Sequence, residues 1–126
     1  ESAKWLAEIE KQEGVQKTES GLLYRIDREG EGAQATADTD VVLVNYEGKT
    51  RDGKVFDSSY ERGEPISFPL NGVIKGWTEG MKLVKAGGQI TLWIPSELAY
   101  GENGAGSDIG PNEALEFKVE LLEVNP

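Results

Sequence analysis

The sequence contains no cysteine and no histidine among its 126 residues. Without cysteine the chain can form no disulfide, no thiolate zinc site and no cysteine nucleophile. Without histidine it has no imidazole to act as a general base, which excludes most hydrolase mechanisms. We therefore expect no metal, no cofactor, and a function in which no side chain has to carry a proton near neutral pH.

The chain also lacks a long apolar run and an excess of basic residues. No stretch of about 18 apolar residues is present, so no membrane-spanning helix is expected. The 23 acidic residues outnumber the 13 basic ones, and the net charge of −10 disfavours nucleic acid and anionic membranes as partners. One domain with its own core fits this length. Because Glu1 opens the chain without a signal-peptide pattern, we expect a mature or trimmed product.

Apolar periodicity predicts two helices and several strands. Trp5, Leu6 and Ile9 form an apolar strip within residues 1–13, a helix that must pack on the domain or end a longer helix. Apolar residues at helical spacing between positions 74 and 84, interrupted by two glycines, predict a short helix held by packing. Asp52-Gly53 is a hairpin turn signal. Strands are predicted at residues 22–27, 41–48, 54–56, 66–70, 89–94 and 115–121.

Two other kinds of site are disfavoured by the sequence. The glycine-rich loop at residues 100–112 matches neither phosphate-binding glycine motif, and it precedes a strand instead of a helix, so we expect no nucleotide site. The acidic pairs Asp38/Asp40 and Asp52/Asp57 lie at a strand start and at a hairpin, where we interpret them as ordinary solvated groups. The loop at residues 100–112 is long, and loops of that length are often functional; the alternative interpretation is a surface loop without a function.

Aromatic and large aliphatic residues gather near the ends of the predicted strands. Periodicity alone would place each of them in the core. Together they could line a concave apolar pocket with a few polar atoms, the usual form of a small-ligand site. The residues concerned are Tyr46, Phe56, Asp57, Val73, Ile74, Trp77, Tyr100 and Ile109.

The same residues belong to short motifs spread over nearly the whole chain. The motifs are Val44-Asn45-Tyr46-Glu47-Gly48, Val55-Phe56-Asp57-Ser58-Ser59, Arg62-Gly63-Glu64-Pro65, Val73-Ile74-Lys75-Gly76-Trp77, Leu98-Ala99-Tyr100-Gly101, Ile109-Gly110-Pro111-Asn112-Glu113 and Leu115-Glu116-Phe117-Lys118-Val119. In order and spacing they resemble the FK506-binding-protein (FKBP) family of peptidyl-prolyl cis/trans isomerases. The third and sixth motifs resemble its bacterial branch, which contains FkpA and the macrophage infectivity potentiator (Mip).

The resemblance implies a fold and a division of the chain. The fold is α+β, a half-barrel of five or six antiparallel strands wrapped around one short helix at residues 75–84, with an N-terminal helix beside it. Residues 1–20 would be the end of a linker helix and its connector, and residues 21–126 the isomerase domain. In the FkpA and Mip branch that helix leads to a dimerisation region, so the full-length parent would be a homodimer.

The resemblance also implies roles for individual residues. Asp57, Tyr100 and Phe117 would be catalytic, and the backbone N–H of Ile74 would donate a hydrogen bond to the ligand. The chain departs from the family's pattern at two places that bear on substrate preference. Ile66 stands where many members have an aromatic wall, and residues 105–108 with Gly110 form a distinct flap. The substrate-binding residues would be Tyr46, Phe56, Ile66, Val73, Ile74, Trp77 and Ile109.

The function implied is rotation of X–Pro peptide bonds in unfolded or folding polypeptides, with FK506 and rapamycin binding in the same pocket. This reaction needs neither a nucleophile nor a proton transfer, so the absence of cysteine and histidine is compatible with it. Two alternatives stay open: a holdase that binds chains without turnover, and a small barrel that stores an apolar ligand. The resemblance implies export to the periplasm or cell envelope, with the cytoplasm as the alternative.

Overall fold

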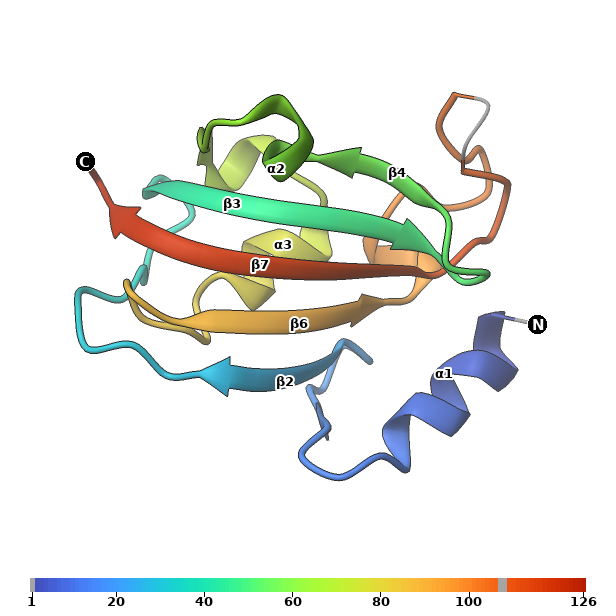
Figure 1. Cartoon of the computed structure of the whole chain (residues 1–126). Coiled ribbons are helices and arrows are strands. Elements are labelled where there is room, and N and C mark those ends of the chain that lie inside the picture. The colour runs from blue at the N-terminus through green and yellow to red at the C-terminus, as the bar shows by residue number, and fades with distance from the viewer. Residues whose placement is uncertain (1, 107–108) are drawn as a thin grey trace.

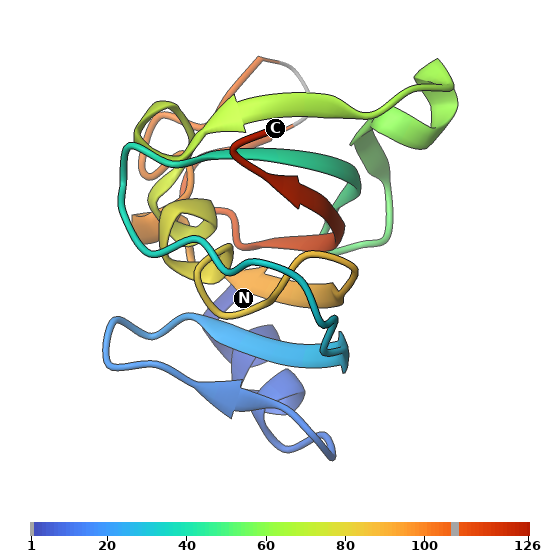
Figure 2. The same ribbon diagram turned by 90° about the vertical axis from the view of Figure 1, so that its left-hand side faces the viewer.

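An antiparallel sheet curves around a short helix in the computed structural model, which describes residues 2–106 and 109–126 (Figures 1 and 2). Within these residues the sheet has seven strands in the order β1-β2-β6-β7-β3-β4, with β5 also paired to β3. The predicted α+β half-barrel is confirmed, but it has seven strands instead of five or six, because the two-residue strand β1 also pairs with β2. The elements are α1 Ser2–Glu10, β1 Gln16–Lys17, β2 Leu23–Arg28, β3 Val41–Thr50, β4 Val55–Ser58, α2 Ser59–Arg62, β5 Ile66–Pro69, α3 Lys75–Gly80, β6 Gln89–Ile94 and β7 Leu115–Val124, with 3-10 turns at Leu70–Gly72 and Ser96–Leu98.

The two longest strands show why the sheet has one buried face. Along β3 every second residue, including Val42 and Val44, is buried, while the residues between them are half-exposed. β7 repeats the alternation, with Val119 and Leu121 fully buried. The two strands pair over most of their length. Their apolar faces therefore coincide and form the concave side of the sheet.

Helix α3 lies against this concave side, behind β6 and β7 in Figure 1. It ends at Gly80, whereas the sequence predicted a helix to Val84; residues 81–84 form turns instead. A Cβ at Gly76 would lie 2.5 Å from the Ile94 side chain, and one at Gly80 would lie 2.7 Å from Leu92. The two glycines therefore let the helix backbone approach β6 closely, although they lower its helix propensity.

A second, smaller apolar cluster lies on the other face of the sheet. Leu23 and Trp93 face each other across β2 and β6, and both are buried. Helix α1 covers them with Ile9, and with the partly buried Trp5 and Leu6. Of the two possibilities left by the sequence, the helix thus packs on the domain. The helix ends at Glu10 instead of at residue 13. None of the helices in the described part of the chain has the length and apolar character needed to span a membrane.

The outer edge beyond β3 is broken by a short helix that the sequence did not predict. The Asp52-Gly53 turn joins β3 to β4 as expected, with the Thr50 N–H donating to the Lys54 carbonyl at 2.9 Å. The chain then leaves the sheet for α2 and returns as β5, which also pairs with β3. Helix α2 therefore fills a gap between two strands on the same edge of β3.

Candidate active site

A cavity of about 370 Å³ opens between α3 and the concave face of the sheet. Its walls come from β3, β4, β5, α3, β7 and the loops after β5 and β6, so the tertiary fold brings distant segments together. The lining residues are Tyr46, Phe56, Asp57, Phe68, Gly72, Val73, Ile74, Trp77, Tyr100 and Phe117.

Aromatic rings in edge-to-face contact build the wall and floor of this cavity. Trp77, which is 4% exposed, is the floor, and its ring centroid lies 5.2 Å from that of Tyr46 and 5.4 Å from that of Phe117. Phe56 packs on Phe117 at 5.5 Å, with an angle of 87° between the ring planes. Such pairs favour edge-to-face geometry because the positive ring edge meets the negative face. The cavity wall is therefore held by its own rings before any ligand binds.

Glycine is required at one point behind the wall. A Cβ at Gly48 would lie 2.7 Å from both the Phe56 and the Phe117 rings. Gly48 is also where the register between β3 and β4 shifts. The missing side chain lets the two rings approach over the β3 backbone and sets the position of this wall.

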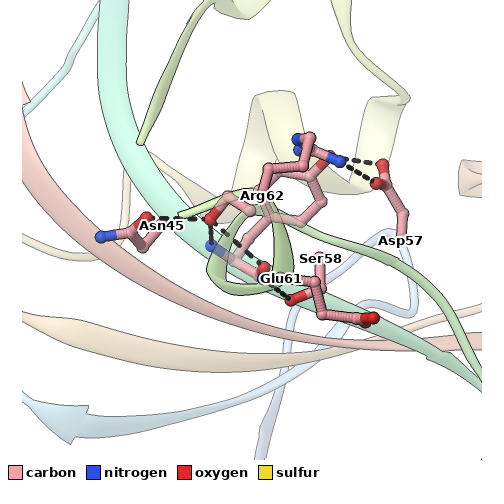
Figure 3. Close-up of polar contacts among 7 residues, drawn as sticks. Asn45, Asp57, Ser58, Glu61 and Arg62 are labelled. Carbon is pink, nitrogen blue, oxygen red and sulfur yellow. Dashed lines mark hydrogen bonds and ion pairs between the residues drawn. The ribbon is translucent and has the colours of Figure 1, made fainter. Parts of the chain in front are cut away.

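One carboxylate lies among the aromatic rings. The Tyr46 hydroxyl donates a short hydrogen bond to Asp57, and the Arg62 guanidinium donates to the other carboxylate oxygen at 2.6 Å. Figure 3 shows Arg62 reaching from α2 toward Asp57. Arg62 also donates to the Tyr46 hydroxyl at 3.2 Å and lies over its ring, 5.7 Å from the centroid. The three side chains therefore hold one another at the cavity mouth.

These contacts move the pKa values of the cavity groups away from neutrality. Partial burial raises the pKa of Asp57, but hydrogen bonds from Tyr46 and Arg62 outweigh it, so the pKa lies below its ordinary 3.8. Burial and the hydrogen bond to Asp57 raise the pKa of Tyr46 above 10.0. Burial and the negative charge of Asp57 raise the pKa of Tyr100 above 10.0. Asp57 is therefore ionised, and both phenols are neutral, throughout the neutral range.

The structure brings all but two of the predicted site residues to the cavity. Ile66 does not line it: at the start of β5 opposite Val44, its side chain is 37% exposed. Phe68, two residues further along the same face of the strand, lines the cavity instead, 5.4 Å from the Trp77 ring. The period of two was the signal that could have indicated Phe68. The aromatic wall on this side is therefore present but displaced along the strand.

The second exception is Ile109, which is buried in the main core and not in the cavity lining. Its backbone forms a two-way bridge with Ala105, with N–H to carbonyl distances of 2.9 and 3.1 Å. Residues 107 and 108 of the predicted flap lie outside the described residues. Gly110, which follows Ile109, donates its N–H to the Glu113 carboxylate at 2.8 Å.

A backbone donor on a lining residue and a cation that contacts Asp57 complete the polar groups at the cavity. The N–H of Ile74 precedes α3 and has no hydrogen-bond partner among residues 2–106 and 109–126. The cation is Arg62, which was not predicted from the sequence, because nothing in the local pattern indicates that α2 turns it back toward Asp57. Over the same described ranges no cluster of three acidic residues could hold a metal ion.

Comparisons with known proteins agree with this geometry. A family model described as FKBP-type peptidyl-prolyl cis-trans isomerase matches residues 32–122, and one described as the domain amino terminal to it matches residues 1–26. The chain is 54% identical to a probable FKBP-type peptidyl-prolyl cis-trans isomerase of Haemophilus influenzae, over 100% of this chain and 52% of that protein. It is 56% identical to the 22 kDa FKBP-type isomerase of Escherichia coli, over 98% of this chain and 60% of that protein.

A solved structure shows the same architecture. The crystal structure of FkpA from Escherichia coli superposes with a TM-score of 0.94 at 50% identity, over 99% of this chain and 58% of that chain. This chain spans about half the length of the curated relatives it matches, with shares of 52%, 44% and 60% for three of them.

Proposed function

Because the chain belongs to the family of FKBP-type peptidyl-prolyl cis-trans isomerases, we propose that its cavity catalyses rotation about X–Pro bonds in polypeptides. The observation that carries the proposal is an aromatic cavity with one ionised carboxylate and one unpaired backbone donor among the described residues. The substrates would be proline-containing unfolded or folding chains.

The chemistry of this reaction fits the residues present. Resonance makes the prolyl C–N bond partly double, and rotation about it has a barrier of about 18–20 kcal/mol. The planar amide is more polar than the twisted one, so water stabilises the planar form. A dry cavity of aromatic rings removes that stabilisation. An acceleration of about 10⁵ would require roughly 7 kcal/mol in total.

Within this proposal the residues have distinct roles. Trp77 on the floor, with Tyr46, Phe56 and Phe68, would receive the proline ring and exclude water. The Ile74 N–H would donate to a substrate carbonyl, and Val73 would contact the chain. Asp57, Tyr100 and Phe117 would act on the twisting amide by charge, hydrogen bonding and exclusion of water. Ile66 and Ile109 stay outside the proposed site.

A proline-peptide isomerisation assay tests the proposal. We expect turnover by the chain without substitutions. For Phe117→Ala we expect a loss of at least about tenfold in kcat/KM, because the substitution opens the dry wall of the cavity to water. Lys118→Ala is the matched control, since Lys118 is the exposed neighbour on the opposite face of β7. Suppression of aggregation without turnover would instead support a holdase, and neither activity would support a ligand-storing barrel.

We also propose that FK506 and rapamycin bind in this same cavity. Its aromatic lining suits an apolar ligand that carries carbonyl groups, and so does the Ile74 N–H, which has no partner in the described part of the chain. Saturating drug is expected to abolish isomerisation, with mutual competition between drug and peptide. Full activity in the presence of bound drug would contradict a shared site.

Two further proposals concern the parent polypeptide. The chain is 54% identical to FkpA and 50% identical to Mip. This similarity supports two proposals: that the full-length parent is located in the cell envelope, and that it forms a homodimer through a region before residue 1. Cell fractionation and light scattering on the full-length parent test these proposals. A cytoplasmic or a monomeric parent would contradict the respective proposal.

A further inference from the structure

Among the residues that the structure describes, none forms a strand beside Asn45 and Tyr46 on one side of β3. On that side β5 pairs with residues 41–44 and β4 with residues 47–49, and the chain between them forms α2. The Tyr46 N–H points into this gap, where a strand carbonyl would ordinarily accept it. It donates instead to the Oγ of Ser59 at 2.8 Å. The side chain of Ser59 therefore takes the place of a missing strand.

The Ser59 hydroxyl is buried and oriented. Ser59 is 0% exposed and Tyr46 is 5% exposed, so water does not compete for this hydrogen bond. The Oγ lies 2.9 Å from Oδ1 of Asn45, to which it donates. A hydroxyl has one proton and two lone pairs. Because the proton is directed at Asn45, a lone pair is left to accept the Tyr46 N–H.

Ser59 is also the first residue of α2, the helix that carries Arg62. With four residues, this helix is too short to be stable by itself. The ion pair between Arg62 and Asp57 does not anchor it either, because those side chains are 46% and 41% exposed and such surface pairs contribute little. The hydrogen bond from the buried Tyr46 N–H to the buried Ser59 Oγ joins this helix directly to β3.

On the basis of the proposed function, we infer that Ser59 is a positioning residue of the isomerase site. Its hydroxyl fixes the backbone of Tyr46 and the start of α2. Through them it fixes the Tyr46 phenol and the Arg62 guanidinium, the two groups that hold Asp57 at the cavity. Ser59 itself does not line the cavity. Its effect on the reaction is therefore indirect.

The test compares Ser59→Ala with Ser58→Ala. Ser58 is also buried, at 3%, and caps the same helix by accepting the Glu61 N–H at 3.4 Å, whereas the Tyr46 N–H donates to Ser59. Both changes weaken α2, and only Ser59→Ala frees the Tyr46 N–H. Isomerase kinetics and amide hydrogen exchange are measured at a temperature where each variant is folded.

We expect Ser59→Ala to lower kcat by about tenfold, since small displacements of catalytic groups have effects of that size or larger, while KM changes less than about twofold. The Tyr46 amide should exchange faster in this variant alone, and Ser58→Ala should stay within about twofold of the parent in kcat. If Ser59→Ala does not fold, Asn45→Ala is measured instead. It removes the nearer of two acceptors of the Ser59 hydroxyl, which lies at 2.9 Å against 3.5 Å for the Tyr46 carbonyl, and Asn45 is only half-buried.

The outcomes separate the inference from the function on which it rests. An inactive parent chain overturns the proposed function itself. An active parent whose Ser59→Ala and Ser58→Ala variants have equal kcat overturns the positioning role and leaves the function intact. Unchanged exchange of the Tyr46 amide in Ser59→Ala also overturns it.

Discussion

Among residues 2–106 and 109–126, the ionisable side chains that line the cavity are one carboxyl and two phenols. The pKa of Asp57 lies below 3.8, and the pKa values of Tyr46 and Tyr100 lie above 10.0. None of the three changes its charge near neutral pH, and the chain contains no histidine that could. At the scale of the residue, the charges of the groups that line the cavity thus stay the same near neutral pH.

We therefore expect kcat/KM to be flat between about pH 6 and pH 8 and almost unchanged in D₂O, because no lining group titrates and no proton moves in the proposed step. Initial rates over this range, with the folded fraction checked at each pH, measure it. A bell-shaped profile centred near neutrality would indicate general acid–base chemistry and contradict the desolvation mechanism.

The lowered pKa of Asp57 also predicts how acid affects stability. A carboxyl with a lower pKa in the folded state stabilises the fold above its unfolded value of about 3.8, and this contribution is lost as pH falls through the folded pKa. Asp57→Asn should therefore be less stable than the parent at pH 7, and the gap should narrow below about pH 3.8. Urea midpoints at several pH values measure the gap. A gap that widens on acidification would contradict the pKa direction.

At the scale of the element, the position of α3 depends on its two buried glycines. A methyl group at position 76 would overlap three atoms of the Ile94 side chain, at 2.5, 2.7 and 2.9 Å. Alanine favours a helix over glycine by about 1 kcal/mol, but overpacking a tight contact costs about 1–3 kcal/mol. Packing therefore outweighs propensity at this position.

We expect Gly76→Ala to lower the free energy of unfolding by up to about 2 kcal/mol, which is the overpacking cost less the gain in helix propensity. We also expect it to reduce isomerase activity by shifting Trp77. Lys75→Ala, one residue earlier and exposed, should change stability by less than about 0.5 kcal/mol. Denaturant unfolding of both variants gives the comparison. A more stable Gly76→Ala would mean that the helix can move away from β6 without loss.

At the scale of the whole molecule, α1 closes an apolar area on the outer face of the sheet. Trp93 is 3% exposed beneath it, and its indole N–H donates to Glu116 at 2.9 Å. Ile9, at 8% exposure, is the most buried residue that the helix contributes to this cluster. The helix thus shares a core with β2 and β6, and the division into residues 1–20 and 21–126 stays a prediction.

This packing predicts that Ile9→Ala lowers the free energy of unfolding by about 2–4 kcal/mol, in the range for truncating a buried isoleucine. Glu8→Ala, the exposed neighbour on the same helix, should change it by less than about 0.5 kcal/mol. Urea unfolding followed by tryptophan fluorescence measures both variants. Equal midpoints for the two variants would show that α1 does not stabilise the domain.

Local signals in the sequence were enough to predict most of the elements, although not β1 and α2, and to predict which face of the long strands and of α3 is buried. Alternation of apolar and polar residues predicted β3 and β7, and Asp52-Gly53 predicted the hairpin. Apolar residues three and four positions apart predicted that Trp77 lies on the inner face of α3. Together with the resemblance to FKBP domains, these local signals were enough to indicate the fold and most residues of the cavity. They suffice because side-chain direction follows from the period of the backbone alone.

The contacts that each face makes were decided by the tertiary structure. The end of α3 at Gly80, the covering of Trp93 by α1, and Phe68 instead of Ile66 at the cavity all depend on contacts between segments far apart in the chain. The same holds for the turn of α2 that brings Arg62 to Asp57 and Ser59 to Tyr46. Strand register and close packing set these contacts, and both are properties of pairs of elements that no single stretch of sequence contains.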